Sequence, residues 1–80
     1  MNKITTLNKL KINENATVIN IDNKSTLKRR FEDLGIIKNE KISCELESIF
    51  KDPKAYLIKG CLIAIRNDDS KYIKVKIIDK

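Results

Sequence analysis

Histidine, the side chain that most often acts as a general acid or base, is absent from this chain, and the other potentially catalytic residues show no catalytic spacing. The sequence has no histidine, so a nucleophile would need a lysine or a carboxylate as its base, and no such pair is marked by spacing. Asp68 and Asp69 are adjacent carboxylates, but their polar neighbours are typical of a turn. With only two glycines, the chain also lacks a glycine-rich phosphate-binding loop. We therefore expect no catalytic residue and no enzymatic activity.

Cys44 and Cys61 are of a type that can bind a metal ion, but neither has a second cysteine nearby. Zinc sites are usually built from closely spaced pairs of cysteine or histidine. Free cysteine is also among the most frequently buried residue types. We expect both cysteines to be small core residues in a reducing compartment, with no metal site and no bound cofactor.

The charge balance is basic, with a formal net charge of +6 from 17 basic and 11 acidic residues. This balance favours an anionic partner, such as a nucleic acid or an acidic protein surface. Most of the basic residues are lysines scattered along the chain, as on a solvated surface, and arginine occurs only at Arg29, Arg30 and Arg66. No apolar run could span a membrane, and residues 1–10 do not resemble a secretory signal. We expect a cytoplasmic protein that is not inserted in a membrane.

Residues 26–36 are the one stretch typical of a helix of more than one or two turns. Leu27, Phe31 and Leu34 recur at the helical spacing and form one apolar stripe, with charged residues on the other faces. Gly35 follows this stripe, where a left-handed residue commonly ends a helix. The side chains that could cap the first turn are those of Asp22, Asn23 and Ser25. The pattern predicts a short helix that buries one side.

The other apolar segments have the alternation or the β-branched residues of short strands. These segments are residues 16–21, 41–47, 56–58, 61–65 and 73–77. The first alternates imperfectly, which indicates a bulge, whereas the second places Ile42, Cys44 and Leu46 on one face. Lys59 and Gly60 suit a two-residue hairpin turn that pairs Leu57 with Leu62, with Tyr56, Ile58, Cys61, Ile63 and Ile65 on the core face.

A single domain covering residues 1–80 follows from this order of segments. We expect it to be mainly β, a small antiparallel barrel of about five strands with one short helix after the first strand. The last segment, residues 73–77, should pair with the first. Residues 5–10 should form a helical turn, in which Leu7 and Leu10 plug one end of the core. Residues 67–70 should form a polar turn.

Two stretches resemble the FeoA family, small cytoplasmic proteins that accompany the ferrous iron transporter FeoB. Residues 27–36 are similar to the family's "R-L-x-x-L-G" helix, and Asp52, Pro53, Gly60 and residues 63–66 are similar to its "G-D-P…G…L-A-L-R" segment with the spacing intact. The chain departs from the family pattern at Lys51, where a glycine is usual, and at Ile12-Asn13 and Lys38-Asn39, where Pro-Gly is usual. We expect Asn13 and Asn39 to adopt positive φ in place of glycine.

The resemblance implies an SH3-like barrel that acts in ferrous iron transport by binding the cytoplasmic GTP-binding part of a FeoB-type transporter. From the residues themselves we expect no iron site, because ferrous ion favours imidazole and carboxylate ligands, and the chain has no histidine and no cluster of carboxylates in sequence. The alternative function is a small basic barrel that binds RNA or DNA. A nucleic-acid partner is not expected, because two of the four aromatic residues, Phe31 and Tyr56, are assigned to the core.

The candidate partner-binding residues lie between residues 49 and 64 and are Ile49, Phe50, Asp52, Pro53, Leu57 and Leu62. Two of them are apolar beside an Asp-Pro turn, where a loop tip is normally polar, and the two leucines face away from the expected core. Two readings stay open. The surface could be a contact for the transporter or for a weak homo-oligomer, or the turn containing Leu7 and Leu10 could cover it.

Overall fold

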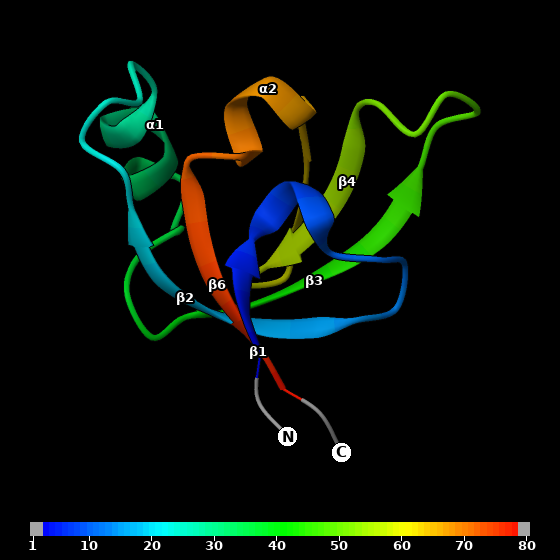
Figure 1. The fold of residues 1–80 in the computed structure, drawn as a ribbon, viewed down its shortest axis with the longest axis horizontal. Coiled ribbons are helices and arrows are strands. Elements are labelled where there is room, and N and C mark those ends of the chain that lie inside the picture. Colours follow the sequence, from blue (N-terminus) through cyan, green and yellow to red (C-terminus); the bar gives the residue numbers. More distant parts are fainter. Residues whose placement is uncertain (1–2, 79–80) are drawn as a thin grey trace.

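The computed structural model describes residues 3–78 and consists mainly of one antiparallel sheet of six strands that curls around a core (Figure 1). The elements in chain order are β1 (Lys3–Thr6), the 3-10 turn η1 (Leu7–Lys9), β2 (Asn15–Ile21), α1 (Lys28–Asp33), β3 (Lys41–Glu47), β4 (Lys54–Ile58), β5 (Cys61–Ile65), α2 (Asn67–Ser70) and β6 (Ile73–Ile77). The strand order is β1-β6-β2-β3-β4-β5. The expected mainly β fold, with a helix after the first predicted strand, is confirmed.

The N-terminal strand β1 is the element that the sequence did not predict. It pairs with β6, from Lys3 opposite Ile77 to Thr6 opposite Lys74, so the sheet has six strands instead of about five. Four residues are too few to show a clear alternation, which explains the omission. The expected pairing of residues 73–77 with the first predicted strand is present between β6 and β2, and the bulge lies between Val18 and Asn20. Residues 67–70 form one helical turn, α2.

The hairpin of β4 and β5 has the predicted register. Tyr56 lies opposite Ile63 and Leu57 opposite Leu62, and the turn residues Lys59 and Gly60 both have positive φ, at 50° and 79°. Two positive φ values in a two-residue turn match the right-handed twist of the strands. Cys61, expected in the core, is exposed, because it directly follows the turn on an edge strand where no further strand covers it. Cys44 is buried as expected.

The N-terminal turn η1 is fastened to the core side of β4. Leu7 and Leu10 are fully buried in the core cluster, as the predicted plug requires. The ammonium of Lys54 donates hydrogen bonds to the carbonyl oxygens of Asn8 (2.7 Å) and Leu10 (3.1 Å), and the Tyr56 hydroxyl donates to that of Leu7 (3.2 Å). These bonds satisfy the backbone of the turn inside the protein, so η1 covers the end of the core.

The helix α1 is shorter than the predicted stretch and buries fewer side chains. Phe31 is buried and Leu27 packs partly against the core, but Leu34 is 40% exposed, so the three-residue stripe is wrong at its last member. The reason is that the helix ends at Asp33 and Gly35, at φ 100°, turns the chain so that Ile36 enters the core instead. No side chain caps the N-terminal residue of the helix, although Ser25 Oγ accepts a hydrogen bond from the amide of Leu27 (3.2 Å).

Three loop residues adopt the left-handed backbone that the family pattern usually assigns to glycine. The φ angles of Asn13, Asn39 and Lys51 are 71°, 74° and 64°. The expectation for both asparagines is therefore confirmed, and lysine bears the same conformation at residue 51 at a higher steric cost. Across residues 3–78, no helix has the length and apolar character needed to cross a membrane.

Candidate partner-binding surface

The loop between β3 and β4 carries two apolar side chains that contact almost nothing. Ile49 is 93% exposed and Phe50 is 88% exposed, and together we call them the tip. Exposed apolar residues that occur singly are common, but two adjacent large ones at this degree of exposure are characteristic of a contact surface. In Figure 1 this loop extends beyond the ends of β3 and β4, away from α1.

Hydrogen bonds fix the backbone of this loop at both sides of the tip. Ser48 Oγ donates to the carbonyl of Asp52 and accepts from its amide, both at 2.9 Å, and the Lys51 amide donates to the carbonyl of Ser48 (2.9 Å). The carboxylate of Asp52 accepts the amide of Asn67 (2.9 Å), and the Asn67 side chain donates to the carbonyl of Lys51 (3.1 Å). Asp52 therefore ties the loop to the start of α2, and the tip is presented in a defined position.

A second apolar surface lies on the outer face of the sheet, and we call it the outer patch. Its members are Leu46, Ala55, Leu57, Leu62 and Ala64. Paired residues in a sheet share a face, and the register joins them in two neighbouring rows, Leu46 with Ala55 and Ala64, and Leu57 with Leu62. Tyr56 and Ile58, which alternate with Ala55 and Leu57, are buried on the other face. The outer patch is therefore continuous across three strands.

Leu46 belongs to this patch because of a bulge that the sequence did not reveal. The expected alternation placed Leu46 in the core with Ile42 and Cys44, but the register shifts between Cys44 and Leu46, so Leu46 pairs with Ala55 and is 57% exposed. A bulge adds one residue to a strand and reverses the facing of those that follow. Strict alternation in the sequence gives no sign of it.

The structure divides the six predicted contact residues into two groups. Ile49, Phe50, Asp52 and Pro53 lie on the loop, and all four are exposed. Leu57 and Leu62 lie further along the hairpin, on the outer patch, and Leu46 and Ala55 lie between the two groups in the register. Because η1 packs on the core side of β4, Leu7 and Leu10 do not cover either group.

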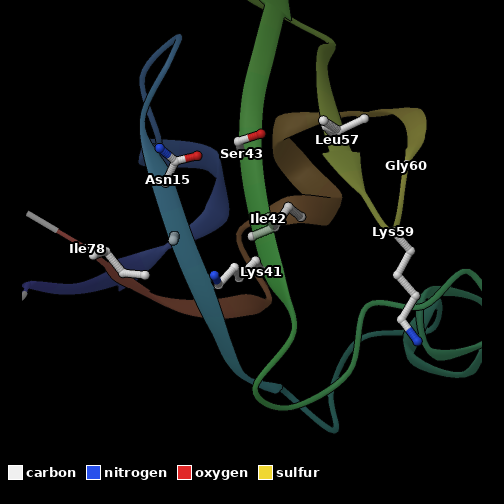
Figure 2. Close-up of a pocket in the computed structure, with 9 residues that line it drawn as sticks. Asn15, Lys41, Ile42, Ser43, Leu57, Lys59, Gly60 and Ile78 are labelled. Atoms are coloured by element: carbon white, nitrogen blue, oxygen red, sulfur yellow. The ribbon is translucent and has the colours of Figure 1, made fainter.

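A shallow groove of about 460 Å³ adjoins the outer patch where β2, β3 and β4 lie side by side (Figure 2). Ser43 and Leu57 form part of its lining, and Ile78 closes one side. Lys41 and Lys59 also line it, and Lys59 forms an ion pair with Glu40 (3.5 Å). Ser43 donates its hydroxyl to a Glu45 carboxylate oxygen (2.6 Å). The sequence did not suggest this groove, because it depends on register between strands far apart in the chain.

The buried titratable groups are those of the core and do not form a reactive site. Burial raises the pKa of the Cys44 thiol and raises the pKa of Tyr56 to about 12. Both effects follow from the loss of solvation that a charged form suffers in the interior. Among residues 3–78, no three His, Cys, Asp or Glu side chains gather closely enough to hold a metal ion.

A curled antiparallel sheet with a helix after β2 and an exposed apolar surface defines a small SH3-like β domain. The family model described as the FeoA domain matches residues 5–77, so the chain belongs to the FeoA family. This match confirms the SH3-like fold class and the resemblance found in the sequence. The comparison with curated proteins gives no match.

Solved structures agree with this assignment. A FeoA-like protein from Clostridium acetobutylicum superposes with a TM-score of 0.89 at 29% identity, over 100% of this chain and 93% of that one. FeoA from Chlorobium tepidum gives 0.85 at 25% identity, over 94% and 71%. FeoA from Stenotrophomonas maltophilia, determined with zinc, gives 0.80 at 21%, over 89% and 88%. It is described as an SH3-domain protein and a candidate activating factor of ferrous iron transport.

Proposed function

We propose that this chain is a non-enzymatic accessory protein of bacterial ferrous iron uptake. In this proposal it works in the cytoplasm, as one domain covering residues 1–80, and binds the cytoplasmic GTP-binding part of a FeoB-type transporter. Membership of the FeoA family supports this role, as does the description of the Stenotrophomonas maltophilia relative. The observation that carries the proposal is the tip, because Ile49 and Phe50 are almost fully exposed on a loop whose backbone is fixed.

The tip and the outer patch are the proposed contact surface. Burying a side chain of the size of Ile or Phe contributes about 1.5 to 3 kcal/mol, so each of the two tip residues could change affinity by about 10-fold to 100-fold. A loop that is already ordered loses little conformational entropy on binding, which favours this use of the tip. Leu57 and Leu62 extend the contact along the hairpin.

The test is a binding measurement between this chain and the isolated GTP-binding domain of the transporter from the same organism, with guanine nucleotide present. Isothermal titration calorimetry should detect a complex, and Ile49→Ser with Phe50→Ser should weaken it at least 30-fold. The matched control is Leu34→Ser, which replaces an exposed leucine at the C-terminal end of α1, and Figure 1 shows α1 far from the loop between β3 and β4. The control should bind like the wild type. Absence of a wild-type complex, or equal binding by the tip variant, would overturn the proposal.

A further inference from the structure

Two adjoining hollows on the outer face of the sheet are lined by lysines. The groove described above contains Lys41 and Lys59, and a second hollow of about 380 Å³ contains Lys38 and Lys76. Ile78 lines both, so the hollows meet at this side chain. None of the described residues that line either hollow is an aspartate or a glutamate. At the edge of the first hollow, however, Glu40 pairs with Lys59, and Glu45 accepts a hydrogen bond from Ser43. Lys41 and Lys76 are therefore the lysines on which the proposal below rests.

The sheet register explains why these lysines face the same way. Lys76 of β6 lies opposite Thr17 of β2, and Thr17 lies opposite Lys41 of β3, so the three residues form one row across the outer face. The next row places Asn15 beside Ser43 and Ser43 beside Leu57. A row that contains two lysines therefore runs directly beside a row that begins with polar residues and becomes apolar at Leu57, and this second row continues into the outer patch through Leu62.

We propose that this surface binds an acidic segment of a partner protein in which apolar side chains are flanked by carboxylates. The apolar side chains would lie over Leu57 and Ile78, both exposed, and the carboxylates would face Lys41 and Lys76. Complementary charge selects this occupant, since opposite potentials attract and like potentials repel. A second copy of the chain is disfavoured because each copy carries a net charge of +6. This inference rests on the proposed function in one respect only, namely that the acidic segment would belong to the transporter.

The first experiment uses a synthetic peptide and does not need the transporter. A fluorescein-labelled octapeptide, EDLELDLE, should bind the full chain, and its affinity should fall as salt is added. Amide chemical shifts should move for Lys41, Ser43, Leu57 and Gly60. Two control peptides, one with serine for each leucine and one with lysine for each acidic residue, should bind at least 10-fold more weakly.

Charge reversal within the basic row provides the matched variants. Lys41→Glu with Lys76→Glu should weaken peptide binding at least 10-fold, whereas Lys9→Glu with Lys24→Glu makes the same change in net charge at exposed lysines outside both hollows and should have a much smaller effect. Equal losses in the two double variants would overturn the proposal, because they would show attraction to net charge alone. Equally tight binding of the serine peptide or of a thymidine oligonucleotide would overturn it too, as would dimerisation of the free chain through this face.

The two proposals can fail separately. If the peptide binds in the hollows but the transporter domain does not bind the chain, the proposed function is wrong and this inference stands. If the transporter domain binds through the tip, while the peptide does not bind and Lys41→Glu with Lys76→Glu leaves the complex unchanged, only this inference is wrong.

Discussion

Tyr56 is a buried side chain that links two elements of the interior. It is fully buried, and its hydroxyl joins β4 to the N-terminal turn through the carbonyl of Leu7. Burial raises its pKa to about 12 from the ordinary value of 10.0. Between these two values the unfolded chain has released the proton while the folded chain retains it, so the free energy of unfolding must fall as the pH rises.

We therefore predict that the free energy of unfolding decreases at alkaline pH and that the ionisation of Tyr56 alone accounts for this decrease. The stability contributed by neutral Tyr56 is complete below about pH 10 and decreases by about 2 to 3 kcal/mol as the pH approaches 12. Urea unfolding across this range should show it. Tyr56→Phe should remove the release of one proton on unfolding, so that the free energy of unfolding falls less steeply with pH. Tyr72→Phe should leave this slope unchanged. An unchanged slope in Tyr56→Phe would contradict this assignment.

Single residues also mark where inference from the sequence reaches its limit. Both cysteines lie in segments that were predicted to be strands, yet Cys44 is buried and Cys61 is exposed. The difference comes from position in the sheet, since β3 has neighbours on both sides and β5 is an edge strand. Residue type predicts average burial, but sheet position decides the individual case.

At the scale of elements, α1 allows a direct comparison of two apolar positions. Phe31→Ala should reduce the free energy of unfolding by about 3 to 5 kcal/mol, because Phe31 is buried against the core and its loss leaves a cavity. Leu34→Ala should cost less than about 1 kcal/mol, because that side chain is 40% exposed. Chemical denaturation of the two variants measures both values. Similar costs would mean that the helix does not pack as described.

The loop between β3 and β4 contains a strained lysine that glycine can relieve. Lys51 has a φ of 64°, a conformation that costs an L-residue about 1 to 2 kcal/mol and glycine almost nothing. Glycine loses more entropy on folding, so the net gain of Lys51→Gly should be at most about 1 kcal/mol. Thermal unfolding should show a higher Tm. Lys51→Ala, which keeps the strain, should give no increase.

The elements that alternate clearly, or that contain a recognisable turn, were predictable from the sequence. β3 and the hairpin of β4 and β5 follow such signals, and Lys59 with Gly60 fixed the register of the hairpin. Bulges were predictable only where the alternation itself fails, as in β2. The shift between Cys44 and Leu46 interrupts a regular pattern because it depends on how β4 pairs with β3, and this pairing places Leu46 on the outer patch.

At the scale of the whole molecule, two of the four aromatic side chains are not available to stack on the bases of a nucleic acid. Phe31 and Tyr56 are buried and cannot stack on bases, and each missing stack removes about 1 to 3 kcal/mol. We predict no sub-micromolar binding to single-stranded or double-stranded oligonucleotides at physiological salt. Fluorescence anisotropy, repeated at low salt, measures this. Tight binding that weakens steeply with salt would contradict it.

The overall fold was more predictable than the surface. Length, the order of helix and strands, and the FeoA motifs together indicated an SH3-like barrel, and the exposed tip followed from apolar residues beside an Asp-Pro turn. The groove and the lysine row could not be foreseen, because the groove forms where β2, β3 and β4 lie side by side, whereas the row crosses β6, β2 and β3 and joins Lys41 to Lys76, which are 35 positions apart (76 − 41) in the printed sequence. Sequence patterns predict which side of a strand a residue faces. The shape of a concave surface depends instead on how strands that are distant in the sequence are placed relative to one another.

The pairing of β1 with β6 also has a consequence for biosynthesis. Residues 3–6 leave the ribosome well before residues 73–77, so the edge of the sheet made by β1 cannot form until β6 has emerged. Growth at about 5 to 20 residues per second makes this a wait of several seconds. The hairpin of β4 and β5 needs only local contacts and can form earlier. Of the described strands, β1 is therefore synthesised before the others but can pair only after β6 has been synthesised.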